Sequence, residues 1–375
     1  MKFVMYKTIL SNIKFFILLG FVVNPIIIRA QHMQDDGVDL GKTPRRIIRA
    51  CCAFGYDLKI WGVPFVSIDQ VISVDDLGEH HYLGDKGEGT GTIYTNKGGF
   101  IDIGHLRDQI DWTRYIYNTI LKCRGKGAVA IPLRNEAGRK TLYLDVPVQL
   151  GNSDCILLAG KITYDLSLWH EISTWYGAST VPFISEKFSS FSVEDVYSNL
   201  LGIHVGMKTL HSKHHFNKAA TMNIKSTLDS LGAVKTAKET YEAYDAVNNK
   251  WYTNKKRIPS KNITLKRDPD VLNSSHPWII PNQINNIDNS IVLDVPLIST
   301  EGALLTSFYQ FTIDLNYRFP VEEIFPDRES SLINQDDFGI LLNRITHELQ
   351  IMEQSTLTEK KLSVQKEVSL QINPD

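Results

Sequence analysis

The chain has 375 residues, of which 43% are hydrophobic, and its formal net charge is −2. It carries no block of basic residues, which argues against nucleic acid or an anionic membrane surface as the main partner. The length suffices for one large hydrophobic core or two smaller ones. Four cysteines are too few for a disulfide framework in a chain this long.

The N-terminal segment, residues 1–30, is typical of a secretory signal peptide. Lys2, Lys7 and Lys14 precede the short apolar run FFILLGFVV, and Ala30 is the small residue expected before a cleavage point. The run is too short for a spanning helix, which needs about 20 apolar residues. We therefore expect an exported protein, periplasmic or extracellular, with no integral membrane segment after cleavage.

The rest of the chain divides into three parts by composition. Residues 31–43 form a polar leader, residues 44–353 carry the folding signals, and residues 354–375 form a polar tail that we expect to be flexible. Strand and helix patterns mix between 44 and 353 with no clean linker. This organisation predicts a single mixed α+β domain with strands and a helical subregion.

The first predicted elements after the leader are strands. TIYT and FIDI, joined by the turn NKGG, are typical of a hairpin, and the glycine-rich GDKGEGTG before them indicates a turn. A helix is predicted over about 106–123. AVAIPL and TLYLDVPVQL indicate two further strands, and Pro147 in the second favours an edge strand or an irregular one.

Helix patterns dominate the middle of the chain. They predict helices at about 164–176, from a Ser192 cap to about 201, at 216–231 and at 235–248. The last third returns to strands, because apolar and polar residues alternate from Tyr309 to Phe319. Apolar residues from Phe338 to Met352 recur at helical spacing and predict a packed helix.

The stretch LWHEISTWYG contains half of a metal-binding motif. His170 and Glu171 match the start of H-E-x-x-H, in which two histidines one turn apart bind zinc and the glutamate activates water. Thr174 stands where the second histidine is expected. A hydrogen-bonded polar pair at the edge of the core is the alternative interpretation.

The helix that follows carries acids that suit the same site. FSVEDVYSNLLG presents Glu194 and Asp195 at its start. Together, residues 169–202 resemble thermolysin-like zinc peptidases, whose metal helix is followed by an E-x-x-S-D-x-x-G helix that supplies the third ligand. With the glycine matched to Gly202, Asp195 falls at the ligand position, Ser198 at the serine and Asn199 at the aspartate. The resemblance implies zinc and a divergent zincin-like core.

A catalytic zinc site needs three protein ligands and one open position. IDIGHLRDQIDW offers His105 and Asp108, which share a face if this stretch is a helix. The alternative is that Asp102, His105 and Asp108 only cap the helix start, where acids suit its positive end. Tryptophans flank both His105 and His170, which predicts that the two histidines border one polar cleft.

Two other groups of residues have weaker signals. His211, His214 and His215 are interpreted as a solvated run with adventitious metal affinity. Cys51 or Cys52 together with His105 would suit a thiol hydrolase, since nearby arginines favour the thiolate. An oxidising compartment disfavours free thiols.

Longer stretches of the chain resemble a known family. PRRIIRACCAFG, GGFIDIGHLRDQIDWT, WHEISTWYG and FSSFSVEDVYSNLLG are similar to a bacterial family of uncharacterised function, domain of unknown function 4056. The resemblance spans most of the chain after the signal peptide and implies an exported protein. It implies no catalytic residues.

The functional hypothesis therefore rests on the residues. We expect an exported metal-dependent hydrolase that cleaves a peptide or another acyl bond, in a peptide or a cell-envelope component. His170, an oxygen of Asp195 or Glu194, and His105 or Asp108 would bind zinc, and Glu171 would accept a proton from water. The alternatives are a non-catalytic envelope protein that retains a zincin-like fold and the thiol hydrolase.

Overall fold

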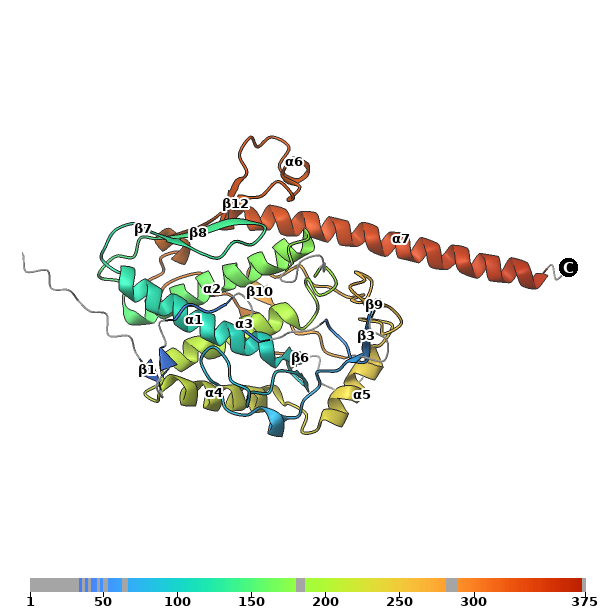
Figure 1. Ribbon diagram of the computed structural model, residues 1–375, viewed down its shortest axis with the longest axis horizontal. Coiled ribbons are helices and arrows are strands. Elements are labelled where there is room, and N and C mark those ends of the chain that lie inside the picture. The colour runs from blue at the N-terminus through green and yellow to red at the C-terminus, as the bar shows by residue number, and fades with distance from the viewer. Residues whose placement is uncertain are drawn as a thin grey trace, which may run out of the picture. The chain divides into compact units, whose positions relative to one another are not determined.

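The computed structural model (Figure 1) describes residues 34–35, 38–39, 42–45, 48–49, 53–62, 67–179, 186–280 and 289–372. The predicted signal peptide, most of the polar leader, Cys51 and Cys52 lie outside these residues. Among the helices in the described part, none has both the length and the apolarity needed to cross a membrane. The described elements belong to one structural unit, and their mixture of helices and small sheets is an α+β fold, as predicted.

The helices and strands have the following bounds. The helices are α1 (Ile103–Cys123), α2 (Asn152–Trp175), α3 (Asp195–Leu210), α4 (Phe216–Leu231), α5 (Ala237–Val247), α6 (Val321–Ile324) and α7 (Phe338–Ile372). The strands are β1 (Gln34–Asp35), β2 (Val38–Asp39), β3 (Leu58–Ile60), β4 (Ser67–Ile68), β5 (Thr92–Thr95), β6 (Gly99–Asp102), β7 (Val129–Pro132), β8 (Gly138–Leu144), β9 (Arg257–Ile258), β10 (Ser274–Ser275), β11 (Leu293–Asp294), β12 (Tyr309–Leu315) and β13 (Leu332–Asn334).

Helices α1, α2 and α3 pack side by side at the centre of the fold (Figure 1). Glycines on α3 allow the close approach of α1. A Cβ atom on Gly202 would lie 2.3 Å from the carbonyl oxygen of Leu106, and one on Gly206 would lie 3.0 Å from Cβ of Thr113. Because only glycine lacks this atom, the two helix backbones pack closer than other residues would permit. Gly202 therefore has a packing role, independent of the peptidase motif.

The hairpin β5–β6 leads directly into α1. Its register is antiparallel, with Thr92 opposite Asp102, and confirms the hairpin predicted from TIYT and FIDI. Since β6 ends at Asp102 and α1 begins at Ile103, the hairpin fixes where α1 starts. On the other side, Phe100 of β6 packs in a small aromatic core with Phe54 and Tyr244.

A four-stranded antiparallel sheet has the strand order β13-β12-β8-β7. The strand predicted from alternation at Tyr309 is confirmed as β12. Of the two alternatives expected for β8, the edge position is wrong, because β8 ends at Leu144, before Pro147, and pairs with β12 on one side and β7 on the other. Proline thus follows the strand and removes no ladder hydrogen bond.

Three predicted helices differ from the observed ones at their ends. Helix α2 begins at Asn152, well before the expected 164. Helix α3 has Glu194 rather than Ser192 as its N-cap and ends at Leu210 rather than at about 201. Helix α7 runs on to Ile372, through most of the segment assigned to a polar tail. The helix predicted at 216–231 matches α4.

Candidate metal centre and adjoining cavity

The first turn of α1 is held by its N-cap, Asp102. Oδ1 of Asp102 accepts a hydrogen bond from the backbone N–H of His105 at 2.9 Å, which places the histidine on the first turn. The backbone N–H of Asp102 donates to Oγ of Ser198 on α3 at 2.9 Å. The start of α1 is therefore fixed against α3.

The first turn of α3 brings a second acid to the same place. Nδ1 of His105 lies 3.2 Å from Oδ2 of Asp102 and 3.3 Å from Oδ1 of Asp195. One donor atom from each of the three residues lies within 4.8 Å of the other two, and all three side chains are buried. This triad of Asp102, His105 and Asp195 could hold a metal ion.

The donor atoms and their spacing fit a small divalent cation. Two ligands about 2.1 Å from a tetrahedral ion lie about 3.4 Å from each other, close to the two distances measured from His105. One imidazole and two carboxylates supply three protein ligands, the number that a catalytic zinc retains. Manganese and iron accept the same donor set.

The charges around the triad also call for a cation. Glu171 and Glu194 add their carboxylates to those of Asp102 and Asp195. Arg267 is a cation that interacts with Glu171, Glu194 and Asp195. Burying charges of one sign together is costly unless something compensates them. A bound metal ion or bound protons would supply that compensation.

The pKa values show how the cluster behaves without a metal. Burial, together with the charges of Glu171 and Asp102, raises the pKa of Asp195 to about 7, although His105 opposes the rise. Burial and the charge of Asp195 raise the pKa of Glu194 well above its usual range. Oε2 of Glu194 is buried and accepts no hydrogen bond within the described part of the chain. The cluster therefore attracts protons when no other cation is present.

A cavity of about 150 Å³ adjoins the triad. His105 and His170 both line it, which confirms the cleft expected from the sequence. The apolar part of the wall comes from Pro44, Trp112, Tyr115, Pro132, Leu133 and Leu166. Among the triad, only His105 lines this space, so it connects the carboxylates to the cavity.

His170 is held by the carboxylate of Glu136, in the loop that joins β7 to β8. Its Nδ1 lies 2.8 Å from Oε1 of Glu136, and Oε2 of Glu136 accepts a hydrogen bond from Nζ of Lys140 at 2.7 Å. The indole of Trp169 donates to the backbone oxygen of Glu136 at 3.1 Å. With Nδ1 engaged, Nε2 is the ring nitrogen left for other contacts, and the side chain remains 19% exposed. His170 is therefore an oriented imidazole, and the triad does not include it.

The other half of the H-E-x-x-H pattern faces the protein interior. Oε2 of Glu171 accepts the backbone N–H of Phe191 at 2.8 Å. The hydroxyl of Thr174 donates to the backbone oxygen of His170 at 2.9 Å and accepts from Ser190 at 2.8 Å. Neither Glu171 nor Thr174 lines the cavity. The structure thus gives no support to the thermolysin-like resemblance.

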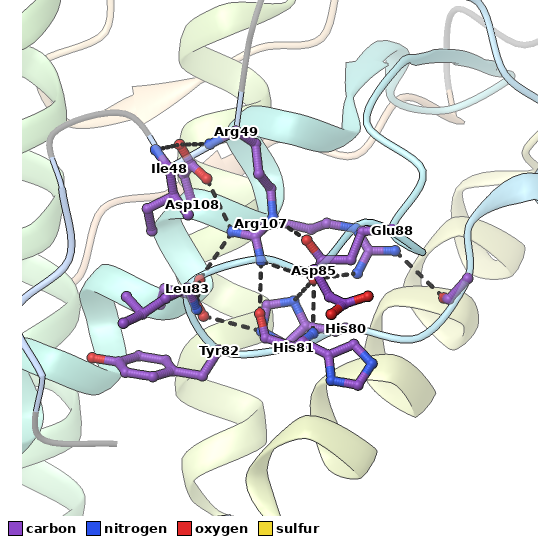
Figure 2. A network of polar contacts seen from close by, with 12 residues as sticks. Ile48, Arg49, His80, His81, Tyr82, Leu83, Asp85, Glu88, Arg107 and Asp108 are labelled. Atoms are coloured by element: carbon purple, nitrogen blue, oxygen red, sulfur yellow. Dashed lines mark hydrogen bonds and ion pairs between the residues drawn. The ribbon is translucent and has the colours of Figure 1, made fainter. Parts of the chain in front are cut away.

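Asp108, a further candidate ligand, belongs to a different cluster (Figure 2). Its Oδ1 accepts a hydrogen bond from Nη1 of Arg49 at 3.0 Å, and its Oδ2 accepts the N–H of Ile48 at 2.9 Å. Arg49 also pairs with Glu88 at 2.6 Å and Asp111 at 2.9 Å. Asp108 lines the cavity, but these partners already use its carboxylate.

Of the candidate ligands, the structure therefore brings His105 and Asp195 together, with Glu194 beside them. Asp102 is the member of the triad that the sequence interpretation treated only as a cap. The signal was present, because an acid at the N-cap accepts the backbone N–H of the residue three positions on, so the two residues lie side by side.

Comparison with known protein families gives a match over the part of the chain that holds the triad. The family model described as a protein of unknown function, DUF4056, matches residues 41–281. The matched region contains the hairpin β5–β6, helices α1 to α5 and the whole triad. No curated protein and no solved structure matches the chain.

Proposed function

We propose that this chain, which belongs to the DUF4056 family, is an exported metal-dependent hydrolase. The observation that carries the proposal is the buried Asp102–His105–Asp195 triad beside a cavity that His105 lines. Zinc is the cation proposed, because it accepts three nitrogen and oxygen ligands and keeps one position for water. When bound, the cation would lower the pKa of that water and polarise an acyl oxygen.

The protein's own groups would orient the substrate and move protons. His170 lines the cavity, and Glu136 fixes its ring, so Nε2 can exchange a proton with a molecule in that space. Glu171 is the other proposed base, but its Oε2 is bound to the backbone of Phe191. The position of His170 on the cavity wall favours it over Glu171.

The proposed substrate is an acyl compound such as a peptide. The aromatic and aliphatic wall suits an apolar group next to the scissile bond, and His105 and His170 supply the polar contacts. Cleavage adds water across the bond. One proton of the water passes to the departing amine or alcohol, and His170 is positioned to carry it.

A structural cation is the second candidate, and it is favoured by the burial of the triad. Asp195 is 2% exposed and His105 is 9% exposed, so an ion there would have little contact with solvent. In that case the ion would stabilise the junction of α1 and α3 in a non-catalytic envelope protein.

Titration of the metal-depleted full chain with zinc tests the site that both candidates need. We expect one ion per chain, and a loss of affinity of more than about 100-fold in Asp195→Asn. His214→Gln, in the exposed histidine run, is the matched control and should leave this ion bound. Binding that survives Asp195→Asn, or that disappears in His214→Gln, would refute the assigned ligands.

Hydrolysis separates the two candidates. Peptide and ester mixtures are incubated with the zinc-loaded protein, and the products are identified by mass spectrometry. His170→Gln should bind zinc normally but lose turnover, and Glu171→Gln should retain it. The reverse pattern would assign the base to Glu171, and zinc binding with no product from any mixture would favour the structural cation.

A further inference from the structure

A second, larger hollow lies next to the cavity. It has a volume of about 950 Å³ and lies between the loop that joins β7 to β8, the end of β12 and the C-terminal end of α2. We call this hollow the arginine groove, since Arg45, Arg134, Arg139 and Arg318 line it.

The acids in the arginine groove are already engaged. Asp314 pairs with Arg139 at 2.5 Å. Glu136 binds Lys140 through one oxygen and His170 through the other. These contacts pair both acids with groups other than Arg45, Arg134 and Arg318.

Three arginines keep their charge available for a ligand. Within the described residues, no ion pair engages Arg45, Arg134 or Arg318, and all three side chains are exposed. The whole chain has a net charge of −2, so a local excess of positive charge runs against its average. Like charges gathered in one hollow repel each other, and an anion would relieve that repulsion.

The arginine groove shares part of its wall with the cavity of the proposed active site. Arg134 and Glu136 line both spaces. A molecule that reaches His170 from the groove would therefore pass Arg134. The guanidinium group binds carboxylate and phosphate oxygens through two parallel hydrogen bonds, which makes it selective for such groups.

We infer that the arginine groove binds the anionic part, carboxylate or phosphate, of the substrate whose scissile bond lies in the cavity. The inference rests on the proposed function for the location of the bond, but the binding of the anion needs no metal. It narrows the substrate class to acyl compounds that carry oxyanions. Among peptides, it favours those with acidic side chains or a free C-terminal carboxylate.

The experiment measures anion binding by the metal-depleted full chain at low salt. The probes are citrate for carboxylates and tripolyphosphate for phosphates, each titrated calorimetrically. We expect saturable binding of at least one probe at millimolar or lower concentration, and weakening by salt because exposed charges are screened. The probe that binds more tightly identifies the oxyanion.

Paired variants show whether the binding is local. Arg134→Gln with Arg318→Gln should weaken binding at least about tenfold. Lys225→Gln with Lys238→Gln, on α4 and α5, removes the same charge outside the groove and should change the affinity less than about twofold. Absence of saturable binding, or an equal loss in both double variants, would overturn the inference.

A further variant keeps this result independent of the metal site. Asp195→Asn should bind the anion as the unaltered protein does, because Asp195 does not line the groove. If zinc does not bind but anion binding depends on Arg134 and Arg318, the inference about the groove is supported and the proposed hydrolase function is refuted. If zinc binds but neither anion does, the inferred class of anionic substrates is refuted and the proposed hydrolase function is not.

Discussion

Nδ1 of His105 lies 3.3 Å from Oδ1 of Asp195, across the junction between the first turns of α1 and α3. Two contacts between α3 and the start of α1 hold this distance. Ser198 accepts the N–H of Asp102, and Gly202 lets α3 approach the backbone of α1. The ligands are therefore positioned by helix packing, so changes in that packing should affect metal binding.

The first prediction concerns Gly202→Ala. The added Cβ would lie 2.3 Å from the carbonyl oxygen of Leu106, so α3 must move away from α1. We expect a loss of stability of about 1–3 kcal/mol, and weaker zinc binding because Asp195 moves with α3. Urea unfolding and zinc titration measure the two effects.

Gly339→Ala is the matched control for this substitution. A Cβ at position 339 would meet Leu272 at 3.7 Å, an ordinary contact, and Gly339 lies in α7. Alanine should be neutral or stabilise the protein there by up to about 1 kcal/mol. Equal stability of Gly202→Ala and the unaltered protein would show that the helices do not need this approach.

The second prediction is the pH dependence contributed by Asp195. In the folded, metal-free protein, its pKa is raised from 3.8 to about 7, so the native state retains a proton that the unfolded state releases. Stability from this group is therefore lost as the pH rises from about 4 to about 7. Relative to Asp195→Asn, the metal-free protein should become less stable over this range.

Zinc should reverse the sign of this difference. Because the ion binds the deprotonated carboxylate, zinc-loaded protein should gain stability relative to Asp195→Asn as the pH rises. Urea unfolding at several pH values, with chelator and with zinc, provides the comparison. A metal-free difference that is flat between pH 4 and 7 would mean that Asp195 is not buried as a proton-binding acid.

The third prediction concerns the cluster around Arg49 (Figure 2). Arg49→Met would leave Glu88, Asp108 and Asp111 buried without their main cation. Removing one partner of buried ion pairs costs about 3–5 kcal/mol. Chemical unfolding should show a loss of this size, with zinc still bound by the protein that remains folded.

The control for Arg49 is an arginine in a more exposed pair. Arg328 bonds to both oxygens of Asp337, and its side chain is 30% exposed. Arg328→Met should cost no more than about 1 kcal/mol, because solvent screens such pairs. Similar losses for the two variants would argue that the Arg49 cluster is open to water.

The fourth prediction concerns Thr174→His, which completes the H-E-x-x-H pattern. The sequence alone favours a gain in zinc affinity. In the structure, Thr174 is buried, bonded to Ser190 and absent from the cavity wall. We therefore expect destabilisation by about 1–3 kcal/mol from overpacking and no gain in zinc affinity. Tighter zinc binding by this variant would show that the metal site lies on α2 and contradict the assignment to the triad.

Local signals in the sequence predicted much of the fold. The hairpin, α4 and β12 follow from turn residues and periodicity, which depend on neighbours in the chain. The interior position of β8 did not follow, because Pro147 lies beyond the strand end and only its pairing with β12 decides the place.

Only part of the candidate site could be predicted, because its geometry depends on contacts between distant parts of the chain. His105 and Asp195 were both identified by residue type, and their meeting depends on how α1 packs on α3. Asp108 shares a helical face with His105, which suggested a ligand, but Arg49 reaches it from a distant part of the chain. Contacts between residues far apart in the chain cannot be predicted from the spacing of residue types along it.

The central claim is that Asp102, His105 and Asp195 bind one metal ion. Crystals of the full chain grown with zinc, measured on both sides of the zinc absorption edge, locate the ion directly. We predict one anomalous peak within about 2.3 Å of a donor atom from each of the three residues. No peak there, or a peak only at His170 or at the run from His211 to His215, would contradict the account.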